Sequence, residues 1–450
     1  MHAFRFISSR HLFSGKKLYP DHACSHGIEK SDTLVNGRIY SMKKDSSKTM
    51  IISTAFSGGG AEAVARTMVE TSEGASGVLF ENFAEIECRG RPVRVICGSK
   101  KDGMISKILV NMWRVLVVQY LKIIEKPRVT VSHLEGPNFA NLLTVLGGRR
   151  VIFVHNCVSE NYNGKSILHR SKRALVHLSY NTANLICCVS ADVRKDLIEN
   201  YGVPEFKTEV FPNPINCKRI VRQSLVLYGD SRDLLLNNNY IISVASLTYQ
   251  KNHQLLISVF NMLLKKSMIP PDLKLILAGE GPEKRSLEQQ CASLGLAFAD
   301  LQNRENRPSA QVLFLGFQIN PYPLLRRARL LIMPSLWEGL PIALLEAMAL
   351  GVPSVVSNCS AGIQDAFSLR MDEMEQLSAS GFVQANVGVL VRKPVSADSS
   401  TAGFWSKIIS EVLIDFDYLN FCSKMSPLRA SEYDVDHVSA LWREKIFERH

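Results

Sequence analysis

Two glutamates stand eight positions apart in a strongly apolar stretch. Glu338 and Glu346 lie within Pro-Ser-Leu-Trp-Glu-Gly-Leu-Pro-Ile-Ala-Leu-Leu-Glu-Ala-Met-Ala-Leu-Gly-Val-Pro, residues 334–353. Pro341 suits the first turn of a helix and Gly351 suits its end. Because this helix would be apolar on every face, we expect it to be buried, and Glu346 then needs a hydrogen-bond partner. Glu338 precedes the helix, where the helix dipole favours an anion.

A lysine lies in the turn after one predicted strand, and a histidine directly follows another. Lys251 lies in Ser-Leu-Thr-Tyr-Gln-Lys-Asn-His after a strand at 240–246, and it can neutralise a phosphate as a point charge. His155 ends the apolar run 151–154. Doubly wound folds bind ligands at this carboxyl edge of the strands, which favours functional roles. A solvated loop lysine and a structural histidine are the alternatives.

Two glycine-containing turns also follow strands. Gly59 and Gly60 belong to Ser-Gly-Gly-Gly-Ala-Glu after the strand that begins at Thr49, and Gly279 and Gly281 belong to Ala-Gly-Glu-Gly-Pro. Glycine lets a backbone approach a ligand closely, and strand, glycine turn and helix open a nucleotide-type α/β unit. Plain turn formation explains each motif equally well when it is taken alone.

Apolar runs alternate with helical patterns along the chain, which predicts parallel sheets covered by helices. Strands are expected at 49–55, 93–97, 129–132, 151–154 and 185–189, and then at 240–246, 273–278, 312–315, 330–333, 353–356 and 388–391. We therefore predict an α/β fold of two tandem Rossmann-like, doubly wound domains. Their predicted bounds are 48–214 and 239–400, with a disordered extension at 1–47, a linker at 215–238 and closing helices at 401–450.

Taken together, these motifs resemble the retaining glycosyltransferases of the GT-B fold, specifically the large nucleotide-sugar family four (glycosyl transferases group 1), which builds bacterial surface polysaccharides. The resemblance covers about residues 50–395. Its hallmark is a pair of glutamates with seven residues between them, which Glu338 and Glu346 match in the family's surrounding context. Residues 53–62, 210–214 and 357–365 resemble its Gly-Gly-Ala-Glu loop, its interdomain Pro-Asn segment and its glycine-rich loop under the donor diphosphate.

The resemblance implies two domains that face each other across a cleft, the first binding the acceptor and the second a nucleotide-sugar donor. Glu346 would hold the donor ribose, Glu338 would face the sugar and Lys251 would stabilise the departing diphosphate. His155 would lie near the reacting sugar. Further donor contacts are expected from Gly59, Gly60, Ser246, Gly279, Gly281, Gly339 and Leu340.

The implied reaction is the retaining transfer of a hexosyl or N-acetylhexosaminyl group from a UDP-sugar onto a growing surface polysaccharide or lipid-linked glycan, an EC 2.4 hexosyltransferase. Cations and N–H groups can stabilise the leaving diphosphate, and a fixed carboxylate can stabilise an oxocarbenium-like sugar. No metal or other cofactor is therefore expected. The Asp-x-Asp pairs at 415–417 and 434–436 are interpreted as surface charge.

Two positions depart from the family pattern. Ala245-Ser246-Leu247 stands where the family usually has Gly-Arg-Leu, and Ile363-Gln364-Asp365 replaces a common Pro-Arg-Glu. Losing a charge-assisted contact costs on the order of 2 kcal/mol, so another basic residue substitutes, the donor differs, or the enzyme is weak or inactive. A degenerate, non-catalytic nucleotide-binding partner subunit and a nucleotide-sugar epimerase of the same fold are the alternatives to a transferase.

The chain has a formal net charge of +11, which suits an anionic membrane or a phosphate-rich substrate. Basic amphipathic segments at 105–126 and 159–177 would rest on such a membrane or hold an acceptor phosphate, and Arg170, Lys172 and Arg173 are the candidate contacts. A solvated helix face is the alternative. No nucleic-acid module or membrane-spanning run is visible. We expect a cytoplasmic protein, attached peripherally to the inner face of the cytoplasmic membrane.

Overall fold

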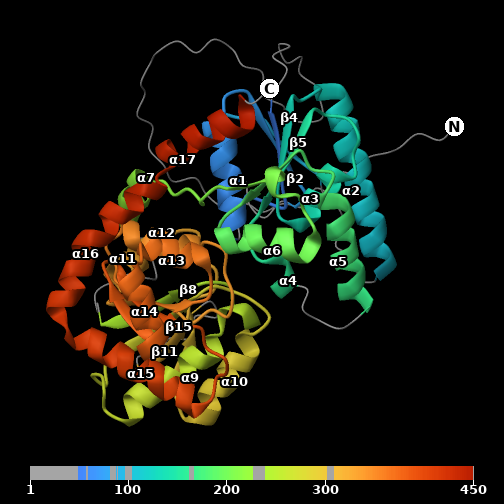
Figure 1. Cartoon of the computed structure of the whole chain (residues 1–450). Helices are drawn as coiled ribbons and strands as arrows, with labels where there is room; N and C mark the ends of the chain where they lie inside the picture. The colour runs from blue at the N-terminus through green and yellow to red at the C-terminus, as the bar shows by residue number, and fades with distance from the viewer. Residues whose placement is uncertain are drawn as a thin grey trace, which may run out of the picture. The chain divides into compact units, whose positions relative to one another are not determined.

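The computed structural model describes residues 49–56, 59–81, 88, 90–96, 104–161, 167–226, 239–301 and 309–448. The predicted extension at 1–47 lies outside these residues. Two parallel sheets follow each other along the chain, as Figure 1 shows. Each is built from short apolar strands with helices between them, so the predicted α/β fold with two tandem Rossmann-like domains is confirmed.

The first sheet has seven strands in the order β3-β2-β1-β4-β5-β6-β7, all parallel. Its central strands are buried along their length, which is typical of a sheet covered on both faces. The strands are β1 Thr49–Ser53, β2 Ala75–Leu79, β3 Val93–Val95, β4 Val129–His133, β5 Arg149–Val154, β6 Leu185–Cys188 and β7 Thr208–Val210. The helices are α1 Gly60–Thr71, α2 Met104–Glu125, α3 Glu135–Leu142, α4 Val158–Asn161, α5 Ile167–Tyr180 and α6 Ala191–Tyr201.

The sequence prediction missed β2, although this strand pairs with β1 near the middle of the sheet. The segment reads Ala-Ser-Gly-Val-Leu, whose small residues weaken the apolar signal. Gly77 is required there because an added Cβ would lie 2.9 Å from the ring of Phe56. The strand is therefore specified by packing, which no local pattern records.

The second sheet has eight strands in the order β10-β11-β9-β8-β12-β13-β15-β14, and only β14 runs antiparallel within it. The strands are β8 Tyr240–Val244, β9 Lys274–Ala278, β10 Phe298–Asp300, β11 Val312–Phe314, β12 Leu330–Met333, β13 Ser354–Asn358, β14 Phe382–Ala385 and β15 Gly388–Arg392. The helices are α9 His253–Lys265, α10 Lys284–Leu294, α11 Tyr322–Arg327, α12 Ile342–Ala349, α13 Ala361–Phe367 and α14 Met371–Ser380.

The predicted linker contains a helix, α7 Cys217–Ser224, where the polar composition suggested loose chain. The side chain of Asn216 caps it by accepting a hydrogen bond from the N–H of Arg219 at 2.8 Å. The remainder of the predicted linker, 227–238, lies outside the described residues.

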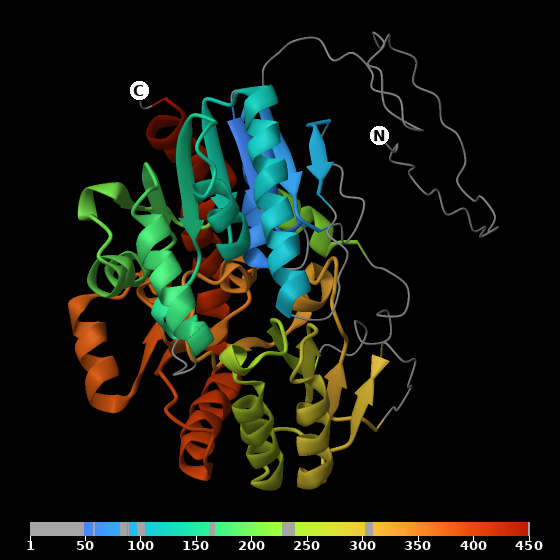
Figure 2. The same ribbon diagram turned by 90° about the vertical axis from the view of Figure 1, so that its right-hand side faces the viewer.

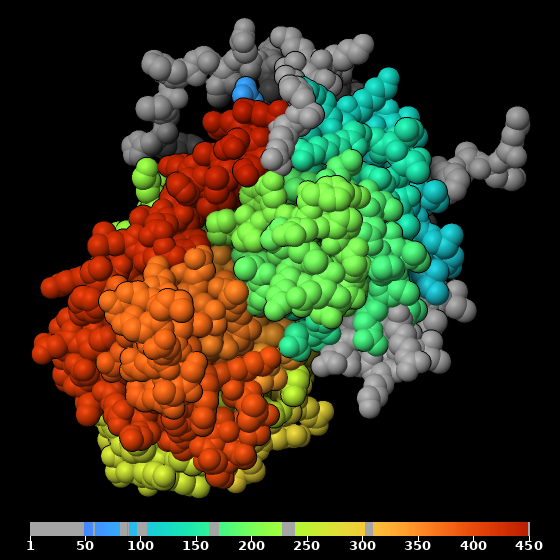
Figure 3. All heavy atoms as spheres, in the orientation of Figure 1, coloured from blue at the N-terminus to red at the C-terminus, as the bar shows by residue number. Residues whose placement is uncertain are grey.

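The C-terminal helices α15 Ser399–Ile414, α16 Phe416–Ala430 and α17 Val435–Trp442 do not all close the second domain. Trp442 and Ile446 are fully buried in one apolar cluster with Ile51 and Phe153 of the first sheet. Figure 3 shows the end of this segment, in dark red, beside the atoms of the first domain. The chain therefore returns to complete the first core, which the helical pattern of 401–450 does not reveal. Within the described part of the chain, we find no helix with the length and apolarity to cross a membrane.

Candidate active site

The topology brings Lys251 to Glu338. In the second sheet β8 lies between β9 and β12, so the order reverses at β8. Ligands of doubly wound sheets bind outside the carboxyl ends of strands at such a switch point. The turn after β8 carries Lys251 and the turn after β12 carries Glu338. The two turns are far apart in sequence, yet they emerge side by side from neighbouring strands.

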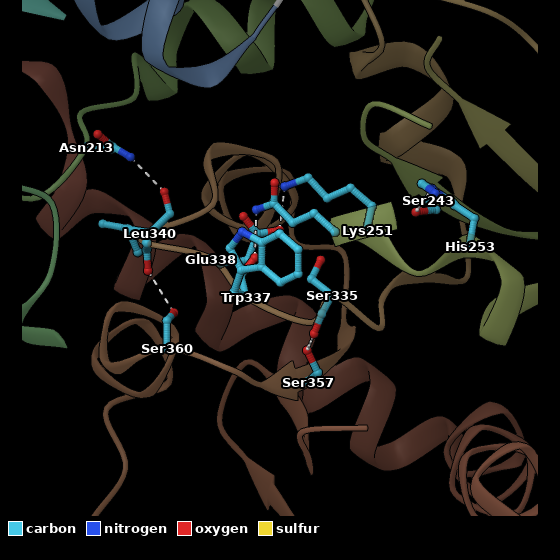
Figure 4. Close-up of polar contacts among 12 residues, drawn as sticks. Asn213, Ser243, Lys251, His253, Ser335, Trp337, Glu338, Leu340, Ser357 and Ser360 are labelled. Atoms are coloured by element: carbon cyan, nitrogen blue, oxygen red, sulfur yellow. Dashed lines mark hydrogen bonds and ion pairs between the residues drawn. The ribbon is translucent and has the colours of Figure 1, made fainter. Parts of the chain in front are cut away.

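Lys251 and Glu338 form a buried ion pair (Figure 4). The Nζ of Lys251 donates to Oε1 of Glu338 at 2.5 Å, and the exposed fractions of the two side chains are 18% and 5%. Burial makes such a pair costly to break, because one partner would keep an unpaired charge in a poorly solvated place.

Backbone and amide hydrogen bonds fix the two turns around the ion pair. The side chain of Gln250 donates to the carbonyl of Trp337 at 2.7 Å, and the N–H of Leu336 donates to the carbonyl of Gln250 at 2.8 Å. Asn252 adopts a left-handed conformation, with φ 53°, and its side chain donates to the carbonyl of Pro334 at 3.2 Å. The ammonium group is therefore held by a rigid frame, as preorganised electrostatic stabilisation requires.

Glu346 is partly buried and receives a hydrogen bond from a residue that the sequence did not indicate. The hydroxyl of Tyr322, at the start of α11, donates to Oε1 of Glu346 at 2.8 Å. Poor solvation raises the pKa of Glu346 to about 7, while the Tyr322 bond and the nearby Arg66 guanidinium act in the opposite direction. Tyr322 carries no spacing signal, so only the folded contact identifies it.

The first domain reaches this helix through its glycine turn. An added Cβ at Gly60 would lie 3.3 Å from the side chain of Ile342, so α1 begins directly against the start of α12. Arg66, farther along α1, lies close enough to Glu346 to lower its pKa. Gly59 precedes α1 as its N-cap residue. The structure thus brings the predicted Gly59 and Gly60 beside the helix that carries Glu346.

His155 lies at the carboxyl end of β5 and pairs with a second histidine. The Nε2 of His155 lies 3.2 Å from Nδ1 of His133, which ends β4. Burial lowers the pKa of His155 to about 4 and that of His133 below its ordinary value, so both rings are neutral at pH 7. His133 was missed although it directly follows the predicted strand 129–132, which is the same signal that identified His155 after 151–154.

The turn after Glu338 packs against the first domain. An added Cβ at Gly339 would lie 2.2 Å from the carbonyl oxygen of His155, so only glycine fits there. The side chain of Asn213 donates to the carbonyl of Leu340 at 2.7 Å, and both residues are buried. The predicted Gly339 and Leu340 therefore lie where the interdomain segment, the His155 strand and the Glu338 turn meet.

Gly279 and Gly281 have a packing role that is visible in the structure. An added Cβ would lie 1.8 Å from the carbonyl oxygen of Ala245 at Gly279, and 2.3 Å from that of Leu247 at Gly281. The turn after β9 thus crosses directly over the turn after β8. Ser246 is exposed in the turn after β8. Donor contact by these three residues stays a prediction.

The predicted acceptor residues lie elsewhere, on α5. Arg173 is exposed and Lys172 is partly exposed, while the side chain of Arg170 lies outside the described part of the chain. Across the side chains that the structure describes, no group of three metal-ligating residues converges.

The two Rossmann-like domains are those of the GT-B fold, and the second carries Lys251 and Glu338 at the carboxyl edge of its sheet and Glu346 on α12. The chain belongs to the glycosyl transferases group 1 family. The model of that family matches residues 230–370, and the model of Glycosyltransferase Family 4 matches residues 78–219. Together these matches cover more than half of the chain.

Named relatives and solved structures agree with this assignment. The chain is 27% identical to the N-acetylgalactosamine-N,N'-diacetylbacillosaminyl-diphospho-undecaprenol 4-alpha-N-acetylgalactosaminyltransferase of Campylobacter jejuni, over 60% of this chain and 68% of that one. It is 26% identical to the UDP-Gal:alpha-D-GlcNAc-diphosphoundecaprenol alpha-1,3-galactosyltransferase of Escherichia coli, over 46% and 50% of the two chains. The structure of Anabaena Alr3699/HepE in complex with UDP and glucose matches with a TM-score of 0.66 at 18% identity, over 89% of this chain and 100% of that one.

Proposed function

We propose that this glycosyltransferase moves a sugar from a UDP-sugar to a lipid-linked or growing surface glycan, with retention of the anomeric configuration. The observation that carries the proposal is the buried pair of Lys251 and Glu338, fixed at the switch point of the second sheet. Glu346 lies on α12, the helix that follows Glu338, and it accepts a hydrogen bond from Tyr322. A rigid cation suits the diphosphate of the donor, and two separate carboxylates suit its sugar and its ribose.

In the proposed reaction, the bond between the anomeric carbon and the diphosphate oxygen breaks, and UDP leaves with the electron pair. The acceptor hydroxyl forms the new bond on the same face, and its proton passes to the departing phosphate oxygen. Lys251 exchanges its contact with Glu338 for one with the diphosphate. Glu338, then freed, faces the positive charge that develops on the sugar.

The printed names of similar proteins support the donor and the acceptor class. The Escherichia coli relative is named for UDP-Gal and for a diphosphoundecaprenol acceptor, and Alr3699/HepE was solved with UDP, with glucose and with UDP-glucose. A lipid-linked acceptor places the reaction at a membrane surface. We therefore propose peripheral attachment on the cytoplasmic side, where nucleotide sugars are available.

We also propose that transfer needs no metal, because Lys251 supplies positive charge at the position of the leaving group. Arg66 and Arg219 lie close enough to influence Tyr322, which contacts Glu346. They are candidates for the additional positive charge that Ser246 does not provide. Activity that is unchanged by EDTA is the expected result, and its loss on chelation with recovery on adding Mn²⁺ would overturn this point.

Glu346→Gln is expected to weaken UDP binding by about 10–100-fold in calorimetry, because a charged acceptor for the ribose hydroxyls is lost. The affinity of the wild-type protein should also depend on pH. Since the pKa of Glu346 is about 7, lowering the pH below 7 protonates the carboxylate before UDP can use it. The dissociation constant should then rise about tenfold per pH unit, and fall to a plateau above pH 8.

Tyr322→Phe is the matched comparison, since it removes the hydroxyl that contacts Glu346 and keeps the ring. The hydrogen bond from Tyr322 lowers the pKa of Glu346, so its loss should raise that pKa. The dissociation constant for UDP should then begin to rise at a higher pH than in wild type. No binding of UDP, GDP or their sugars to the wild-type protein would contradict the proposed function. A pH-independent affinity for UDP in the wild-type protein would contradict the role of the Glu346 carboxylate.

A further inference from the structure

One apolar side of α2 faces outward. Figure 2 shows this helix, in cyan, lying lengthwise over the outside of the first sheet. Eight of its large apolar side chains are between 48% and 62% exposed, and they recur at spacings of three and four residues, which places them on one stripe. They are Ile108, Leu109, Met112, Trp113, Leu116, Tyr120, Ile123 and Ile124.

The inward side of α2 is apolar as well, since Val118 is fully buried against the first sheet and Val115, Val117 and Leu121 pack with it, and the same side carries two cations. Lys122 is 1% exposed, and its Nζ donates to Oδ1 of Asn141 at 2.7 Å and to Oγ1 of Thr144 at 2.5 Å. Arg114 places its guanidinium 4.9 Å from the centre of the Phe80 ring. A helix on the surface of a globular protein normally turns its apolar stripe to the core. In α2 the side with Val118 meets that expectation, and the outward stripe is a second apolar side that this packing does not use.

A loop beside α2 extends the apolar surface. Val145 is 84% exposed and Leu146 is 54% exposed, and both follow α3. The loop is attached to α2 by its polar groups, since the N–H of Val145 donates to Oε1 of Gln119 at 2.9 Å and Thr144 contacts Lys122. Its apolar side chains therefore remain outward. Exposed apolar surface on this scale marks an interaction site.

The charges around the apolar stripe indicate what kind of partner it contacts. Exposed lysines stand at its two ends, Lys107 and Lys126, and the helix's acidic residue, Glu125, is ion-paired with Arg94. A second copy packed antiparallel on this face would bring like charges together. Trp113 and Tyr120 lie within the stripe, and these two residue types prefer the interface between water and lipid. Apolar, aromatic and flanking basic residues on one helix are typical of an interfacial membrane helix.

We propose that the outward face of α2, together with Val145 and Leu146, inserts into the headgroup region of an anionic lipid bilayer, with the helix lying along the surface. The inference rests on the proposed function and deepens it, because a lipid-linked acceptor is presented at such a surface. Of the two segments that the sequence suggested, 105–126 and 159–177, it assigns the membrane contact to the first, and to its apolar residues in place of the basic residues on α5.

Sedimentation with phosphatidylglycerol–phosphatidylcholine vesicles tests the proposal. The double variant Leu116→Gln/Ile123→Gln is expected to partition at least about tenfold more weakly than wild type, because two inserted side chains become polar. Both positions are exposed, so the fold should persist, as circular dichroism would verify. Ile319→Gln is the matched control, since Ile319 is 90% exposed in the second domain, and its partition should equal that of wild type.

Fluorescence provides a second measurement. The emission of Trp113 should shift to shorter wavelength on adding these vesicles, and Trp113→Phe should abolish the shift. Equal partition of the double variant and wild type would overturn the proposal. A wild-type dimer that ignores vesicles and becomes monomeric in the double variant would also overturn it, because a second copy would then cover the face.

The proposed function is separable from this inference. Calorimetry with UDP, and transfer to a water-soluble acceptor in the absence of vesicles, report on the active site alone. A wild-type protein with both activities intact that fails to bind vesicles would leave the proposed function standing and reject the α2 surface. Vesicle binding by a protein that binds no nucleotide would reject the proposed function and keep the membrane surface.

Discussion

Replacing Lys251 by methionine is expected to lower kcat by about 10²–10³-fold, with a smaller change in KM. The reason is that its ammonium group would neutralise charge that develops only as the diphosphate departs, and removing one preorganised donor of this kind typically costs about 3–4 kcal/mol of transition-state stabilisation. The structure holds Nζ rigidly at 2.5 Å from Glu338, so no reorganisation of the loop is needed when the donor replaces the carboxylate. Initial rates of UDP release with a saturating acceptor measure the effect.

The substitution also leaves Glu338 buried without its cation, which destabilises the fold independently of catalysis. Lys251→Met/Glu338→Gln removes both charges and should recover stability in urea unfolding while activity stays low. Lys407→Ala is the matched lysine control, because Lys407 is 72% exposed on α15 and should leave kcat unchanged. A fully active Lys251→Met protein would refute the role assigned to the lysine.

Much of this centre could be predicted because its residues lie in short motifs at the ends of strands. The apolar runs identify β8 and β12 locally, and a doubly wound order brings their carboxyl ends together. Lys251 and Glu338 therefore had to approach each other once the fold was assigned. The burial of α12 likewise follows from its composition, and with it the need of Glu346 for a partner.

The partner itself could not be predicted. Tyr322 and Arg66 come from elements whose local sequences fit an ordinary helix start and an ordinary helix surface. Their approach to Glu346 is set by how α1 and α11 pack around α12, and packing across elements leaves no periodic mark in one sequence. The same holds for Trp442, which joins the first core although it lies at the far end of the chain.

The orientation of α2 shows a different limit. Hydrophobic periodicity predicts that a helix has an apolar side, and the usual inference is that this side faces the core. Here the helix has two apolar sides: the side with Val118 packs in the core, while the stripe with Leu116 is turned outward. The sequence indicated an amphipathic helix, but only the contacts show which side is solvent-facing.

Gly279→Ala is expected to destabilise the second domain by about 3 kcal/mol and to lower donor affinity as well. Its Cβ would lie 1.8 Å from the carbonyl oxygen of Ala245, a backbone atom that cannot rotate away. The two turns are also tied together, since the N–H of Ala245 donates to the carbonyl of Ala278 at 3.1 Å and that of Leu247 to Glu280 at 2.8 Å. Any relief of the clash must therefore move the turn that leads to Lys251.

Gly403→Ala is the matched control for this change. Gly403 lies inside α15, and its added Cβ would meet only the sulfur of Met262, at 3.6 Å, which is ordinary contact. Alanine at a helix interior stabilises by about 0.5–1 kcal/mol relative to glycine, so urea unfolding should show opposite signs for the two substitutions. Equal stability of Gly279→Ala and wild type would mean that the β8 turn yields easily. The rigid frame argued for Lys251 would then be wrong, because that frame begins at the same turn.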